Sequence, residues 1–135
     1  MSEESKKLMA AAKEAAANRV TNKAVWLRLM GRAKELPESV TGIARWSIMR
    51  LALESYETQP VIREVMLELY EKPALNGDVN ATRMLESYAR QSGDKELLSR
   101  FREETTGPQA GYRTLRRVHY QAPAIIDDSD DRLPQ

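Results

Sequence analysis

Apolar residues recur at helical spacing throughout residues 1–107. Apolar positions spaced i, i+3, i+4 and i+7 lie on one face of a helix, whereas a strand needs strict alternation, which this stretch lacks. We therefore expect an all-α fold, a compact bundle of about five to six helices. The expected segments are Ser2–Arg19, Lys23–Leu36, Glu38–Tyr56, Thr58–Lys72, Asp78–Gln91 and a short helix after Asp94 that carries Leu97, Leu98 and Phe101 and stops at Gly107-Pro108.

Local signals bound these segments. Short polar residues favour the N-cap position and proline is tolerated in a first turn, whereas glycine and later prolines end helices. The expected caps are Asn22, Thr58 (with Pro60 in the first turn), Asp78 and Asp94, and the expected stops are Pro37, Pro73, Asn76-Gly77 and Ser92-Gly93. A glycine inside a helix costs about 1 kcal/mol, so Gly31 predicts a close approach of another element.

The segments differ in how they should pack. Glu38–Tyr56 is apolar nearly all round, which predicts a central helix. Ser2–Arg19 is Ala-rich with a shallow apolar stripe, so we expect it to fray or to pack on another small-residue surface. After Gly107 no helical period persists, and Arg116–Ile126 favours a short extended segment. The chain thus predicts a basic N-terminal helix (1–20), a helical core (21–107) and an extended C-terminal arm (108–135).

One short phrase occurs three times, as Leu53-Glu54-Ser55-Tyr56, Leu67-Glu68-Leu69-Tyr70 and Leu85-Glu86-Ser87-Tyr88. It either marks a repeated unit whose tyrosines meet a common partner or reflects ordinary helix composition. The spacings are shorter than the roughly 34 residues of standard helical repeats, so no solenoid is predicted. With the large apolar side chains, the tyrosines make up the expected oligomer interface: Trp26, Trp46, Met49, Tyr56, Tyr70, Tyr88, Tyr120, Ile125 and Ile126.

The net charge of +1 conceals an asymmetry. Residues 1–34 carry eight Lys/Arg and three Glu, whereas residues 35–104 carry nine basic and thirteen acidic residues. Such a distribution predicts contact with an anionic partner or head-to-tail contact between copies. Cations that would neutralise nucleic-acid phosphates are Lys6, Lys7, Lys13, Arg19, Lys23, Arg28, Arg32, Arg113, Arg116 and Arg117. A solvated helix face is the alternative for the cations of residues 1–34, and it is the more usual role of such residues. Docking of the arm on the acidic middle of a neighbouring subunit is the alternative that we favour for Arg113, Arg116 and Arg117.

Catalytic and metal sites are not indicated. The chain has no Cys, and its one histidine, His119, supports no Ser-His-Asp grouping. The acidic run Asp127–Asp131 lacks the glycine and distal glutamate of a calcium loop. We expect no enzyme activity, no cofactor and no metal. Neither a signal-peptide core nor a membrane-spanning run is present, so cytoplasmic synthesis is expected.

An Ala/Lys-rich first helix, a Met/Trp-rich bundle and an arm ending in the run Ile125–Asp131 resemble, in style, small bacteriophage virion proteins. These include internal ejection components and connector subunits that form rings or tubes. The resemblance implies a structural role in the particle or in DNA delivery, with the chain itself and other structural proteins as partners and the virion as its destination.

The sequence therefore predicts a non-enzymatic, homo-oligomeric structural subunit. A small terminase-like packaging subunit that binds DNA through the basic front, the cation-rich residues 1–34, is the first alternative. A monomeric cytoplasmic regulator is the second.

Overall fold

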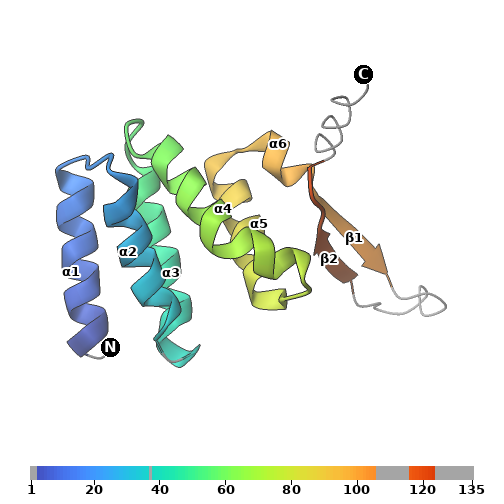
Figure 1. Ribbon diagram of the computed structural model, residues 1–135, viewed down its shortest axis with the longest axis horizontal. Coiled ribbons are helices and arrows are strands. Elements are labelled where there is room, and N and C mark those ends of the chain that lie inside the picture. The colour runs from blue at the N-terminus through green and yellow to red at the C-terminus, as the bar shows by residue number, and fades with distance from the viewer. Residues whose placement is uncertain (1–2, 37, 106–115, 124–135) are drawn as a thin grey trace, which may run out of the picture. The chain divides into compact units, whose positions relative to one another are not determined.

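The computed structural model describes residues 3–36, 38–105 and 116–123, with side chains at 3–36, 43–103 and 118–123. It is mostly helical, which confirms the predicted all-α class, with one short antiparallel sheet (Figure 1). The elements are α1 (Glu3–Ala17), α2 (Lys23–Lys34), α3 (Glu38–Leu53), α4 (Gln59–Leu75), α5 (Val79–Ser92), α6 (Lys95–Leu98), β1 (Phe101–Thr105) and β2 (Arg116–Tyr120).

The chain divides into two compact units, Met1–Lys72 and Pro73–Gln135. In the first unit α1, α2 and α3 pack against one another, side by side in Figure 1. The shallow stripe of α1 is enough for this packing, because Leu8, Ala12 and Ala15 are buried together with Ser5. Small side chains allow helices to approach closely. The predicted boundaries after residues 20 and 107 stay predictions.

The caps at three helix starts are those that the sequence predicts. The side-chain Oδ1 of Asn22 accepts a hydrogen bond from the backbone N–H of Ala24 at 2.9 Å. Asp78 accepts from the N–H groups of two residues of α5, and Asp94 accepts from the N–H of Leu97 at 2.9 Å. Each bond satisfies a backbone donor that has no partner inside its helix.

Thr58 precedes α4 as predicted. An N-cap side chain accepts a hydrogen bond from a backbone N–H of the helix that follows, but the hydroxyl of Thr58 donates one to the helix before it. Thr58 is buried, and its hydroxyl donates to the carbonyl of Ala52, near the end of α3. The side-chain amide of Gln59 donates to the carbonyl of Leu53 at 3.0 Å. The two side chains therefore donate to carbonyls in the last turn of α3, for which that helix contains no N–H donor.

Pro73 does not stop the fourth helix, contrary to prediction, because α4 continues to Leu75. A proline inside a helix leaves the carbonyl four residues earlier without its N–H donor. That carbonyl belongs to Leu69, and the ammonium of Lys34 donates to it at 3.1 Å. The same ammonium lies 5.2 Å from the ring centre of Tyr70. A residue from α2 thus compensates for the proline.

Two further predictions are wrong. The sixth helix is only four residues long, and Phe101 begins β1 instead of extending that helix. β1 pairs with β2 in antiparallel register, with Phe101 opposite Tyr120, so the beginning of the predicted arm is part of a sheet. Gly31 marks no close approach, because a Cβ at this position would meet nothing within 4 Å. The parts of the arm at 108–115 and 124–135 lie outside the described residues.

Candidate interaction surfaces

An apolar stripe lies on the exposed side of α3. Ile43 is 61% exposed and Trp46 is 38% exposed, whereas Ala44, Ile48 and other neighbours on the helix are buried. Arg50 follows four residues after Trp46, and its guanidinium lies 4.9 Å from the centre of the indole ring. Spacings of three and four place these side chains on one face. We call Ile43, Trp46 and Arg50 the α3 stripe.

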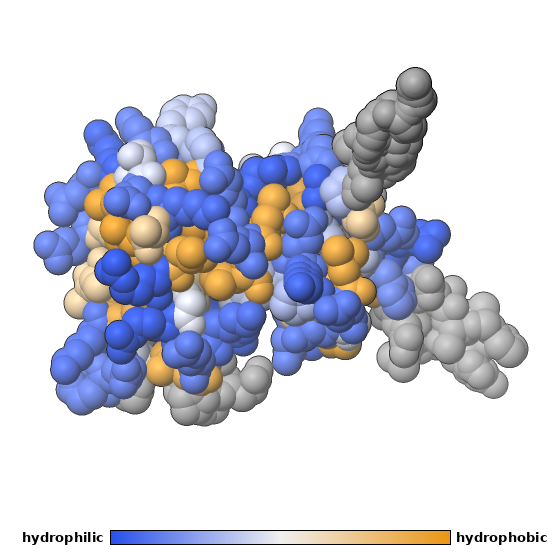
Figure 2. Space-filling model, viewed as in Figure 1, coloured by the Kyte–Doolittle hydropathy of each residue, from blue (hydrophilic) through white to orange (hydrophobic). Residues whose placement is uncertain are grey.

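The sequence predicts that α3 is a central helix, and α3 does pack on both α1 and α2, but the side that carries the α3 stripe is exposed. α3 packs on α1 and α2 through a row of buried residues that includes Ile48 and Met49. The other side presents a large aromatic ring and a branched aliphatic side chain to solvent. Figure 2 shows apolar surface scattered among polar side chains on the face in view. The α3 stripe combines an apolar surface with a cation, so it suits a partner that carries an apolar side chain beside a carboxylate.

Most of the predicted interface residues are covered by the chain itself. Five of them are at most 6% exposed: Trp26, Met49, Tyr70, Tyr88 and Tyr120. The indole N–H of Trp26 donates to the carbonyl of Val20 at 2.7 Å, as a buried tryptophan requires. Trp46 and Tyr56 remain accessible to a partner. Ile125 and Ile126 lie outside the described residues, and the interface role of the whole set stays a prediction.

The three Leu-Glu-x-Tyr phrases occupy different environments. Tyr56 follows the end of α3 and is 86% exposed, whereas Tyr70 and Tyr88 lie inside α4 and α5 and are buried. Beside Tyr56, the hydroxyl of Ser55 donates to the carboxylate of Glu57 at 2.6 Å. This hydrogen bond, helped by the backbone N–H of Glu57, lowers the pKa of that carboxyl. The phrase therefore gives one exposed tyrosine and two core residues.

The predicted cations of the basic front divide into paired and exposed groups. Lys23 lies 2.7 Å from the carboxylate of Glu68, and this hydrogen bond raises the pKa of Lys23. Arg32 pairs with Glu4 at 2.9 Å. The remaining cations of the predicted set in this region are exposed: Lys6, Lys7, Lys13, Arg19 and Arg28. Arg113 and the side chains of Arg116 and Arg117 lie outside the described part of the chain.

A groove of about 690 Å³ lies within the second unit, between the start of α5, the turn before it and β2. Leu75 and Val79 on its rim are 45% and 59% exposed, and Val118 and the single histidine, His119, come from β2. Arg83 and Glu86 add one cation and one anion. Glu86 pairs with Arg90 at 2.6 Å, which leaves Arg83 as the accessible charge at this wall. Sequence reasoning missed this groove.

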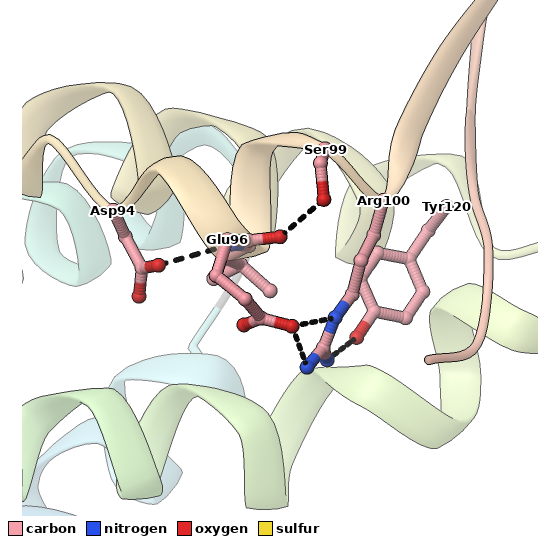
Figure 3. Close-up of polar contacts among 6 residues, drawn as sticks. Asp94, Glu96, Ser99, Arg100 and Tyr120 are labelled. Atoms are coloured by element: carbon pink, nitrogen blue, oxygen red, sulfur yellow. Dashed lines mark hydrogen bonds and ion pairs between the residues drawn. The ribbon is translucent and has the colours of Figure 1, made fainter. Parts of the chain in front are cut away.

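A polar cluster joins α6 to the sheet (Figure 3). The guanidinium of Arg100 donates to the carboxylate of Glu96 at 2.7 Å and to the hydroxyl of Tyr120 at 2.8 Å. The rings of Phe101 and Tyr120 lie 5.1 Å apart, tilted by 59°. Burial lowers the pKa of Arg100, but the hydrogen bonds to Tyr120 and Glu96 outweigh it, so the pKa is raised. The spacing of Glu96 and Arg100 was a visible signal for part of this cluster.

This arrangement is structural in character. Arg100, Glu96 and Tyr120 satisfy one another, and the backbone N–H of Gln121 closes the junction by donating to the carbonyl of Arg100 at 2.7 Å. Among the side chains that the structure describes, those of residues 3–36, 43–103 and 118–123, no group of three or more His, Asp or Glu is placed to hold a metal ion. In the same part of the chain, no helix combines the length and apolar character needed to cross a membrane.

Comparison of the chain with protein-family models, with curated proteins and with solved structures found no match. The surfaces described above are therefore the basis for any functional conclusion.

Proposed function

We propose that this chain is a non-enzymatic structural subunit that associates with copies of itself. The observation that supports this proposal is the α3 stripe, where Ile43 and Trp46 are exposed although Ala44, Ile48, Met49 and Ala52 of the same helix are buried. Exposed apolar area is worth about 25 cal/mol per Å² when it is removed from water, so a large side chain such as Trp46 contributes most when a partner covers it. The setting that we propose, a ring or tube of a bacteriophage particle acting in DNA delivery, rests on the resemblance in style alone.

Sedimentation velocity of the full chain tests self-association. The expected result is a mass above the 15.4 kDa of a single chain, with the larger species gaining population as concentration rises. Ile43→Glu keeps a good helix former but places a charge in the α3 stripe. We expect it to weaken association by about tenfold or more, since one buried aliphatic side chain is worth roughly 1.5–3 kcal/mol.

Ala11→Glu is the matched control for this variant. Ala11 is exposed on α1 of the same unit, so the substitution adds the same charge to the same unit without touching the stripe. A wild-type chain that remains a single 15.4 kDa species at all concentrations would overturn the proposal and favour a monomeric regulator. Equal effects of the two substitutions would show that net charge, not the stripe, governs association.

The second candidate function is a DNA-binding packaging subunit of the small-terminase class. It is favoured by the exposed lysines of α1, Lys6, Lys7 and Lys13. Fluorescence anisotropy with labelled duplex DNA at increasing salt separates the two candidates, because phosphate contacts make affinity fall steeply with salt. A steep slope that flattens when the three lysines are changed to glutamine would support packaging. Weak binding that ignores these substitutions would favour the structural subunit.

A further inference from the structure

The groove of the second unit is bordered by β2, which pairs with β1 in the two-stranded sheet (Figure 1). In the part of the chain that the structure describes, the sheet has two strands, so β2 has one edge paired with β1 and one edge directed away from it. β2 is also the strand that contacts α5. The groove is therefore bordered by a strand that, among the described residues, is paired on one edge, and the second edge of such a strand is where an extended peptide can add a further strand.

The register shows which backbone groups face this edge. The N–H of Gln121 donates to the carbonyl of Arg100 at 2.7 Å, which makes these two residues a hydrogen-bonded pair. Hydrogen-bonded and non-hydrogen-bonded pairs alternate along an antiparallel ladder. His119, opposite Arg102, therefore directs its N–H and C=O toward β1, and Val118, opposite Glu103, directs its own away from β1. Val118 lines the groove, so a donor and an acceptor lie where a peptide backbone would run.

We propose that this groove receives residues 124–131 of a second copy of the chain as an added strand. The proposal rests on the self-association proposed above, and it names a second contact, distinct from the α3 stripe. Neighbouring copies would then be linked tail to groove, which is a heterologous contact that propagates into a ring or a chain.

The chemistry of the segment fits the groove. Ile125 and Ile126 are β-branched and favour extended conformations. Successive side chains of a strand point to opposite faces, so either face presents one isoleucine and, two residues later, one aspartate. The isoleucine would cover Leu75 and Val79, and the aspartate would lie near the exposed guanidinium of Arg83.

The residues that follow β2 favour binding of the tail to the groove of a second copy over binding to the groove of its own chain. A tight hairpin that laid 124–131 on its own strand would need a left-handed residue in the connection, usually glycine or asparagine. The connection is Gln121-Ala122-Pro123, and proline holds φ near −65°. Among the described residues, Arg19 is the one non-glycine residue with a positive φ, so the connection contains no such turn.

Complementation between two full-length variants tests the proposal. Val79→Glu places a charge in the groove at the first residue of α5, where the helix dipole tolerates an acidic side chain. The double substitution Ile125→Asp and Ile126→Asp removes the anchors of the tail. We expect each variant alone to associate more weakly than the wild type in sedimentation velocity, because only the α3 stripe is left to it. An equimolar mixture should recover part of the loss, since one intact groove can still bind one intact tail.

Asn80→Glu is the matched control, because Asn80 is exposed in the same first turn but does not line the groove. It should leave association at the wild-type level. A labelled peptide of residues 121–131 should bind the full-length tail variant, and about tenfold more weakly once Val79→Glu is added. The same residues in scrambled order serve as the peptide control.

The outcomes separate the two proposals. If the tail variant associates like the wild type while Ile43→Glu does not, the added strand is wrong and the structural subunit stands. If both the tail and the groove variants lose association but their mixture does not recover it, the proposal that the tail of one copy binds the groove of another is wrong. If the wild-type chain is a monomer at every concentration, both proposals fail.

Discussion

The two units of the chain are stabilised in different ways. The first, Met1–Lys72, holds most of the large, fully buried side chains, among them Trp26, Met30 and Ile48. The second, Pro73–Gln135, has fewer of them, among them Leu85 and Leu97, and is also held by specific polar contacts: the caps of α5 and α6 and the junction of Arg100 with Tyr120. Burial is worth more per residue than an individual hydrogen bond, so the first unit should lose most from loss of a large side chain and the second from loss of a polar group.

Intrinsic fluorescence makes this comparison measurable. Both tryptophans, Trp26 and Trp46, lie in the first unit, and the second unit has none. Indole emission therefore reports on the first unit, whereas far-ultraviolet circular dichroism reports on the helices of both. Unfolding in urea, followed by the two signals in one sample, assigns the effect of each substitution to a unit.

The largest effect is expected for Trp26→Ala. Trp26 is 0% exposed and its indole N–H is bonded to the carbonyl of Val20, so the variant loses both a large buried surface and a hydrogen bond. Truncating a buried tryptophan typically costs about 3–5 kcal/mol. The urea midpoint, followed by the emission of the remaining Trp46, should fall strongly. A loss below about 1 kcal/mol would contradict the view that burial stabilises this unit.

Asp78→Ala should destabilise the second unit by about 1–2 kcal/mol. Asp78 caps α5 by accepting from the N–H groups of Asn80 and Ala81 at 2.9 and 3.0 Å. Circular dichroism should show the loss while the tryptophan midpoint stays near its wild-type value. Asp78→Asn retains the accepting oxygen, so it should recover most of the stability. Equal losses for the two substitutions would mean that charge, not the cap, is responsible.

Tyr120→Phe should cost about 1 kcal/mol, since it removes one hydrogen bond to a partly buried cation and keeps the ring that packs on Phe101. The loss should again appear in the dichroism signal alone. Tyr56→Phe is the control, because the side chain of Tyr56 is 86% exposed and its hydroxyl is in solvent. If the control costs as much as Tyr120→Phe, the junction with Arg100 contributes no specific stability.

Sequence predicted what depends on near neighbours. The caps at Asn22, Asp78 and Asp94 act on N–H groups two or three residues away, and the stops at Gly77 and Gly93 follow from their own positive φ. These features involve a few consecutive residues, so propensity and spacing contain the necessary information.

Features that need distant residues were not predictable in this way. α4 continues through Pro73 because Lys34, far earlier in the chain, supplies the missing donor, and Phe101 is in a strand because β2 pairs with it. Trp26 and Trp46 lie in similar apolar patterns, but one is buried and the other exposed. The groove combines the α4–α5 turn with β2, so the sequence of neither segment alone predicts it.

Gly31→Ala should have the smallest effect, and it should raise the stability of the first unit where the preceding substitutions lower stability. Gly31 lies inside α2 without a positive φ, and a Cβ there would meet nothing within 4 Å, so alanine fits without strain. Alanine favours a helix over glycine by about 0.5–1 kcal/mol, chiefly by restricting the unfolded chain. We expect the tryptophan midpoint to rise by that amount. Gly93→Ala is the counterpart in the second unit, and its φ of 70° predicts a loss instead. A gain at both positions would show that backbone conformation does not govern these sites.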